Sequence, residues 1–143
     1  MNYNEARITK LRTYLFSIID TLTTNKNYQI NADMLDNDIN NYSLDKIPTA
    51  STVEKWVNGV EIHKDIFSFR SRKAYSQDTI NNLSNIGFFE TFESIIKSNN
   101  KKGVLPEIKG IQSSESLNCG AMLTADTDTA ILDNQIQITY REE

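Results

Sequence analysis

Residues 52–76 read TVEKWVNGVEIHKDIFSFRSRKAYS, and this stretch predicts the central β-hairpin of a sheet. Asn58-Gly59 suits the positive φ angles of a tight turn, and apolar residues flank the pair on both sides. Side chains alternate between the two faces of a strand, so the basic ones of the second strand are expected to point outward and the aromatic ones inward. The inward set is Asp65, Phe67, Phe69 and Ser71, and the outward set is Ile66, Ser68, Arg70 and Arg72.

The residues before this hairpin predict one helix and two short strands. Apolar residues recur at helical spacing over residues 5–23, with charged residues between them, which predicts an amphipathic helix with one core face. Tyr28 and Ile30 indicate a short strand, and residues 33–41 are expected to be mostly loop. Residues 42–47 alternate weakly as a second strand, which Pro48 ends or confines to a sheet edge.

The residues after the hairpin predict a second helical region and two further strands. Ser76 is a good N-cap, the apolar pattern is interrupted at Gly87, and it ends near Gly103, which favours a bent helix or two short ones. Residues 111–122 and 130–140 read as two strands around the polar loop 124–128. This order favours an α+β fold, in which two main helices pack on one face of an antiparallel sheet of mixed strand order, as a single domain over residues 1–143.

Composition and charge argue against several classes of protein. The chain has 15 basic and 19 acidic residues and a formal net charge of −4, whereas an autonomous nucleic-acid-binding domain usually has a basic excess or a basic face. No run reaches the roughly 18 consecutive apolar residues of a membrane span, and the first residues lack the apolar core of a secretion signal. We therefore expect a protein that is made in the cytoplasm and has no membrane partner.

The candidate catalytic residues are the single histidine and the single cysteine. Glu61 and Asp65 lie two residues to either side of His63, but surface strands often carry such triplets, so a solvated histidine is the preferred interpretation. Cys119 in LNCGA reads as a small, partly buried residue, because nothing nearby in the sequence would activate its thiol. One cysteine excludes an internal disulfide, and the two residues alone cannot form a His/Cys zinc site.

Cofactor and metal motifs give no positive signal. Asp126 and Asp128 with Asp133 faintly resemble a calcium loop, but the required spacing, the central glycine and the terminal glutamate are missing. The five glycines form neither a P-loop nor a dinucleotide fingerprint. We therefore predict no catalytic, cofactor-binding or metal-binding residue, no cofactor, and a protein that is not an enzyme.

Two surface features are candidate binding sites. The basic residues at positions 70, 72 and 73, beside Tyr75, could bind nucleic acid, because basic residues interleaved with an aromatic ring contact backbone and base together. The acidic net charge favours a solvated or protein-facing strand instead. Trp56 lies beside a turn, where tryptophan is more often a core residue than an interface residue, although it is enriched where protein interfaces are energetically important.

Three segments together resemble one protein family. They are FSFRSRKAYSQD (67–78), IGFFETFESIIKSNNKKGVLPEI (86–108), and the strand pair IQSSESL (111–117) with ILDNQIQITYREE (131–143). In order and spacing they resemble the tail terminator, or tail completion, proteins of phages, prophages and phage-tail-like bacteriocins of Gram-positive bacteria. The resemblance covers roughly residues 42–143, and Ser114 departs from it where the family usually has an apolar residue.

The resemblance implies a structural assembly protein. Such proteins form a ring, usually a hexamer, on the head-proximal end of the tail tube, where they stop tube growth and join the head or cap a headless particle. The implied partners are other copies of the chain, the tail tube protein, the sheath protein of contractile particles and the head–tail connector, with DNA only passing through the lumen. The protein would be in the host cytoplasm during assembly and then in the particle. The candidate interface residues are Trp56, Lys64, Arg70, Arg72, and the loop 36–41 with Asp36 and Asp38.

Two alternatives stay open. Another neck or head–tail connector protein would share the assembly class and differ in the partner that it binds. A small cytoplasmic enzyme would use Cys119 or His63. An unchanged assembly phenotype in a Cys119→Ala, His63→Ala double variant would count against the enzyme.

Overall fold

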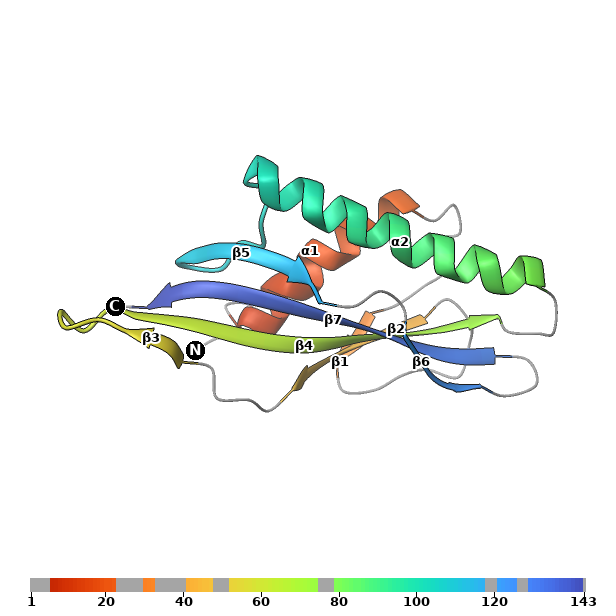
Figure 1. The fold of residues 1–143 in the computed structure, drawn as a ribbon, viewed down its shortest axis with the longest axis horizontal. Helices are drawn as coiled ribbons and strands as arrows, with labels where there is room; N and C mark the ends of the chain where they lie inside the picture. Colours follow the sequence, from red (N-terminus) through yellow and green to blue (C-terminus); the bar gives the residue numbers. More distant parts are fainter. Residues whose placement is uncertain are drawn as a thin grey trace.

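The computed structural model describes residues 6–22, 30–32, 41–47, 52–74, 79–117, 121–125 and 129–142. These residues form two layers, a β-sheet and two α-helices that lie on one of its faces (Figure 1). In chain order the elements are α1 (Arg7–Leu22), β1 (Ile30–Ala32), β2 (Asn41–Ile47), β3 (Thr52–Lys55), β4 (Glu61–Ala74), α2 (Thr79–Lys102), β5 (Ile111–Ser116), β6 (Ala121–Ala125) and β7 (Thr129–Glu142). The predicted α+β class, with a largely antiparallel sheet of mixed strand order, is confirmed.

Two long antiparallel strands form the centre of the sheet. β4 and β7 pair along their whole length of 14 residues, from Glu61 opposite Glu142 to Ala74 opposite Thr129. Two shorter strands line each outer edge of this pair: β3 and β2 pair with β4, and β5 and β6 pair with β7. Among the described strands, β1 alone pairs in parallel, with β2.

The strand predicted over residues 111–122 is divided in the structure into β5 and β6, so that prediction is wrong. From Ser116 to Ala121 the chain advances five residues, whereas its partner on β7 moves only three, from Ile136 to Asp133. A regular strand cannot absorb the two extra residues. The pairing therefore stops and resumes further along the same edge of β7.

Helix α2 is continuous from Thr79 to Lys102, so the predicted alternative of two short helices that meet at Gly87 is wrong. A glycine inside a helix costs about 1 kcal/mol relative to alanine. The burial of Phe92 and Ile96 in the core offsets this cost. The helix ends as predicted before Gly103, which has a φ of 76°. The Gly103 amide donates to the carbonyl of Asn100, and the Val104 amide donates to the carbonyl of Asn99, so carbonyl groups of the last turn are bonded.

The core lies between the two helices and one face of the sheet. Phe69 occupies its centre and stacks between Tyr42 and Phe92, at ring-centroid distances of 5.3 and 5.4 Å. The alternation predicted for β4 is confirmed, because the four inward side chains are at most 1% exposed while Arg70 on the other face is exposed. The other large core residues include Leu11, Leu15, Ile18, Ile19, Leu44, Phe67, Ile96, Ile136 and Ile138.

Candidate functional site

The hairpin predicted at Asn58-Gly59 closes as a three-residue loop at one end of the sheet (Figure 1). The amide of Trp56 donates to the carbonyl of Val60 at 2.7 Å, and the amide of Gly59 donates to the carbonyl of Trp56 at 3.0 Å. The side-chain oxygen of Asn58 accepts a further bond from the Val60 amide at 3.2 Å. Gly59 has a φ of 90°, which glycine adopts readily. These contacts fix the shape of the hairpin tip, residues 56–60.

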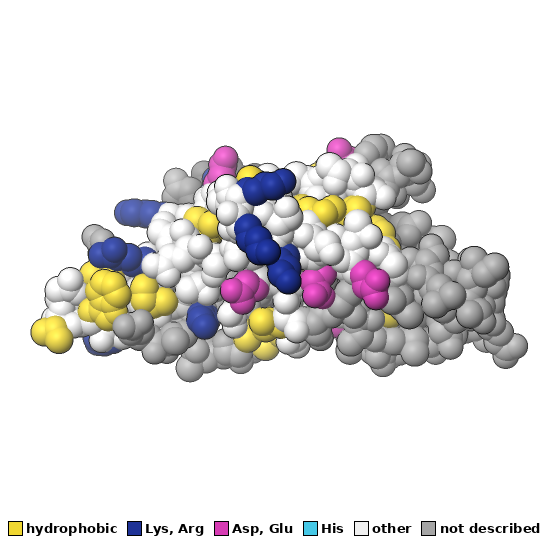
Figure 2. All heavy atoms as spheres, turned by 45° about the horizontal axis from the view of Figure 1, so that its top comes forward, with side chains coloured by type: hydrophobic (Ala, Val, Ile, Leu, Met, Phe, Trp, Pro, Cys, Tyr) yellow, Lys and Arg dark blue, Asp and Glu magenta, His cyan; other side chains and the backbone are white. Residues whose placement is uncertain are grey.

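The hairpin tip exposes two apolar side chains. Trp56 is 41% exposed and Val57 is fully exposed, and Figure 2 shows hydrophobic atoms gathered at this end of the molecule. The guanidinium group of Arg141 lies 5.4 Å from the centre of the Trp56 ring, within cation–π distance. The interpretation of Trp56 as a core residue is therefore wrong. Sequence reasoning missed Val57, although an apolar residue inside a hairpin loop is a signal that could have identified it.

At the base of the hairpin, His63 is buried, so the prediction of a solvated histidine is wrong. Its ring stacks on that of Tyr140 at a centroid distance of 5.3 Å. Its Nε2 lies 3.1 Å from Glu61 Oε2 and 3.2 Å from Glu142 Oε2. Because Glu142 is the last residue of β7, these contacts fasten the end of that strand to the hairpin. A structural role therefore fits this histidine better than that of a general base.

A buried ion pair fastens helix α1 to the same end of the sheet. Asp65 is 1% exposed, and its Oδ2 accepts a hydrogen bond from Arg7 Nε at 3.1 Å, with Lys46 Nζ 3.9 Å away. Arg7 also lies over the ring of Tyr140, 4.6 Å from its centroid. Burial, and then the negative charge of Asp65, raise the pKa of the Tyr140 hydroxyl to about 12. The Arg7–Asp65 ion pair thus holds α1 against the sheet.

The outward face of β4 carries a polar network. Arg70 Nε lies 3.5 Å from Asp45 Oδ2 and donates to Ser68 Oγ at 3.4 Å. Ser68 in turn donates to Asp133, which is buried on β7 and belonged to the faint calcium pattern. The other candidate residues on this face, both half-buried, are Lys64 and Arg72. Arg70 is therefore engaged within its own chain.

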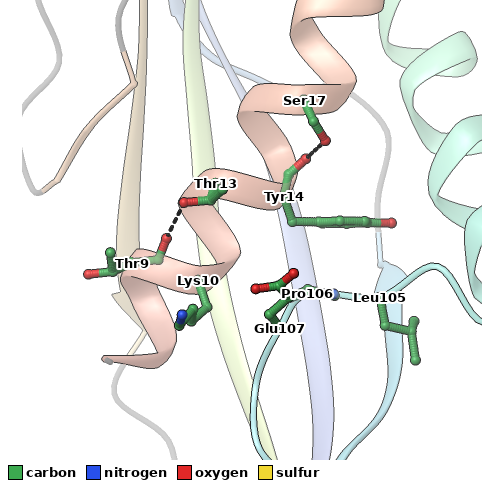
Figure 3. A pocket seen from close by; sticks show the side chains of 8 residues that line it. All are labelled: Thr9, Lys10, Thr13, Tyr14, Ser17, Leu105, Pro106 and Glu107. Atoms are coloured by element: carbon green, nitrogen blue, oxygen red, sulfur yellow. Dashed lines mark hydrogen bonds between the residues drawn. The ribbon is translucent and has the colours of Figure 1, made fainter. Parts of the chain in front are cut away.

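A groove of about 440 Å³, which we call the α1 groove, lies between α1 and the segment that follows α2 (Figure 3). Tyr14 extends from α1 toward the segment that carries Leu105 and Pro106 (Figure 3). Asn99 Nδ2 donates to the Tyr14 hydroxyl at 3.4 Å, and burial raises the pKa of that hydroxyl. The full lining is Thr9, Lys10, Thr13, Tyr14, Ser17, Leu105, Pro106 and Glu107. Sequence reasoning missed this groove because its two walls, residues 9–17 and 105–107, are far apart in the sequence.

A second groove, of about 390 Å³, lies between α2 and β5. One wall contains Ser114, which faces inward opposite Ile138, is 1% exposed, and has an Oγ without a hydrogen-bond partner. Asn100 on α2 accepts a hydrogen bond from the Ser114 amide at 3.2 Å. The helix thus covers part of the free edge of β5, which protects a sheet from pairing with foreign strands.

Six of the sequence candidates fall outside the described residues: Asp36, Asp38, Tyr75, Cys119, Asp126 and Asp128. Within the described ranges, no group of three or more His, Cys, Asp or Glu side chains could hold a metal ion. In the same part of the chain, neither helix is both long and apolar enough to cross a membrane. Comparison of the sequence with protein-family models and with curated proteins finds no match.

Proposed function

We propose that this protein is a tail terminator. It assembles as a ring, a hexamer by the resemblance, on the head-proximal end of the tail tube of a phage or phage-tail-like particle. There it stops tube growth and provides the surface that joins the head or caps the particle. The observation that carries the proposal is that the three resembling segments contribute to β4, α2, β5 and β7, the centre of the sheet and a helix that covers it. Packed elements specify a fold more strongly than surface loops do.

Ring assembly requires heterologous contacts, in which one patch of a copy meets a different patch of the next copy. The hairpin tip supplies an exposed apolar patch at one end of the sheet. Tryptophan, as at Trp56, is among the residue types that contribute most to binding at protein interfaces. The described surface therefore offers at least one feature suited to contact with another protein.

Termination follows if the two faces of the ring differ. One face reproduces enough of the tube subunit's mating surface to cap the last tube ring, and the other lacks the surface that would accept a further one. Tube growth then stops, because no surface is left on which a further ring of tube subunits can assemble. Each copy has a formal net charge of −4, so the ring as a whole is acidic. An acidic lumen would repel DNA and let it slide through.

Light scattering on the purified protein tests the ring, and electron microscopy of labelled protein on isolated tubes tests where it binds. The proposal predicts the mass of a hexamer and label at one end of each tube. A persistent monomer would contradict the ring. A protein that binds the purified head connector but not tube ends would favour the alternative of another neck protein.

The enzyme alternative depends on His63 and Cys119. The contacts of His63 with two carboxylates and an aromatic ring suit a structural role. A Cys119→Ala, His63→Ala double variant that still caps tubes would count against a function that depends on either residue. If the wild-type protein has a measurable turnover and that variant loses it, the result would support the enzyme alternative.

A further inference from the structure

We propose that Asn58 is a site of spontaneous covalent modification, at which the hairpin tip converts its own asparagine to aspartate and isoaspartate. Asn58 is the only asparagine in the chain that a glycine follows. The backbone nitrogen of a glycine is the least shielded in a protein, because no side chain stands beside it. The modification is a property of the hairpin tip itself and does not depend on the proposed function.

The reaction begins with attack of the Gly59 backbone nitrogen on Cγ of the Asn58 side chain. A base such as hydroxide takes the proton of the Gly59 amide, a bond forms between the nitrogen and Cγ, and the side-chain nitrogen leaves as ammonia after taking a proton from water. The product is a cyclic succinimide. Water then adds to one of its two carbonyl carbons and opens the ring. Opening at Cγ gives aspartate, and opening at the backbone carbonyl carbon of Asn58 gives isoaspartate, in which the chain continues through the side chain. The net reaction consumes water and releases ammonia, and no atom is oxidised or reduced.

The reacting atoms lie at the solvent-facing end of the hairpin. Among the residues that the structure describes, Asn58 is the one asparagine outside a helix or strand. The pairing of β3 with β4 ends at Lys55 and Glu61, so the strand ladder does not hold it. Asn58 and Gly59 are both exposed, and apart from its chain neighbours no atom lies within 4 Å of a Cβ position at Gly59. Water and base can therefore reach the site of attack.

A backbone amide of the hairpin tip assists the attack. The Val60 amide donates to Oδ1 of Asn58 at 3.2 Å. Negative charge develops on this oxygen as the nitrogen bonds to Cγ, and a donor that is already directed at the oxygen stabilises that charge. The same hydrogen bond holds the carboxamide next to the backbone that follows Asn58, where the attacking nitrogen lies.

A second backbone hydrogen bond controls when the reaction can occur. The Gly59 amide donates to the carbonyl of Trp56 at 3.0 Å, so its nitrogen must leave this bond before it attacks. Backbone bonds at an exposed loop open locally, without unfolding of the core. The modification therefore requires only a local opening of the hairpin tip.

The two products change the hairpin tip differently. Aspartate keeps an oxygen that can accept the Val60 amide and adds a negative charge. Isoaspartate adds a carbon atom to the backbone between residues 58 and 59, although the length of a hairpin loop sets its turn. The loop then exceeds the span set by the hydrogen bond from the Trp56 amide to the Val60 carbonyl. The exposed side chains of Trp56 and Val57 thereby lose their fixed position.

Peptide mapping by mass spectrometry tests the site. The folded protein is kept in mildly alkaline buffer and then digested with trypsin, which releases residues 56–64 as one peptide and residues 74–97, with three asparagines of α2, as another. Peptide 56–64 should gain the mass of an amide-to-acid conversion at least about 10-fold faster than peptide 74–97, a barrier difference of about 1.4 kcal/mol. An isoaspartate-specific methyltransferase then labels the isoaspartate in peptide 56–64.

Two variants separate the proposed reaction from other losses of an amide. Asn58→Gln keeps the side-chain amide but places it one carbon further from the Gly59 nitrogen, so it should not convert. Gly59→Ala places a methyl group beside the attacking nitrogen and should slow conversion at least about 10-fold. Equal rates in the two wild-type peptides, or a Gly59→Ala protein that converts as fast as the wild type, would overturn the proposal.

The single tryptophan of the chain reports the effect on the hairpin tip. Ion-exchange chromatography isolates the converted protein by its added charge, and the peptide map gives its isoaspartate content. The Trp56 emission should move to longer wavelengths in proportion to that content, because the indole ring becomes more exposed to water. Asn58→Asp, which matches the other product, should emit like the wild type. Unchanged emission in protein rich in isoaspartate would overturn the proposed effect on the tip.

Discussion

Replacing Gly110 by alanine should destabilise the fold more than the same change at the other described glycines. Gly110 lies just before β5 with a φ of 78°, a conformation that side-chain-bearing residues rarely adopt. A Cβ atom at this position would overlap the backbone carbonyl oxygen of Arg141. The Arg141 amide also donates to the Gly110 carbonyl at 2.8 Å. The methyl group would therefore push β7 away at the point where it is held.

The expected loss has three physical parts. The left-handed conformation costs a non-glycine residue about 1–2 kcal/mol. Insertion of a methyl group into a closely packed site costs about 1–3 kcal/mol. Loss of the backbone hydrogen bond adds about 1 kcal/mol. We expect the free energy of unfolding to fall by about 4 kcal/mol in total, and Tm to fall by about 12 °C.

Urea unfolding followed by circular dichroism measures this loss against two matched variants. Gly59→Ala shares the positive φ but meets no atom within 4 Å, so it should cost only about 1–2 kcal/mol. Gly87→Ala lies inside α2 with open space around it and should stabilise the protein by about 0.5–1 kcal/mol. An equal loss in Gly110→Ala and Gly59→Ala would refute the argument that the close approach of β7 sets the cost.

Three further predictions concern the end of the sheet. Arg7→Met removes the nearest cation from buried Asp65 and should lower the free energy of unfolding by about 2 kcal/mol, so an unchanged urea midpoint would contradict the ion pair. His63→Ala should cost about 1–2 kcal/mol in the same assay, since two carboxylates lose their shared partner, and no loss would count against that contact. The unfolded state releases the Tyr140 proton near pH 10, whereas the folded state keeps it until about pH 12. Stability from this group is therefore complete below pH 10 and falls between pH 10 and 12. Tyr140→Phe should reduce that fall in a pH series of urea midpoints, and an identical profile would refute its cause.

The parts of the fold that sequence could predict are those whose signal lies in adjacent residues. The alternation of Phe67 and Phe69 with polar neighbours identified the faces of β4, and the Asn58-Gly59 pair identified its turn. The separation of β5 from β6 depends on their register with β7, which no local pattern records. The continuity of α2 through Gly87 likewise depends on packing against the sheet, which offsets a local penalty.

The same distinction applies to the candidate site. Local pattern identified the hairpin, but the exposure of Trp56 depends on where the rest of the sheet ends. The burial of His63 depends on Tyr140 and Glu142, which reach it only because β4 and β7 pair along their full length. The exposure of Trp56 and the burial of His63 therefore both depend on pairing between strands that are far apart in the sequence.

The measurement that tests the proposed function most directly is the length of tail tubes made with and without this protein. Negative-stain electron microscopy gives the length distribution in each case. A terminator predicts tubes of uniform length when the protein is present, and longer tubes of variable length when it is absent. Tubes of the same uniform length in both preparations would contradict the proposed function.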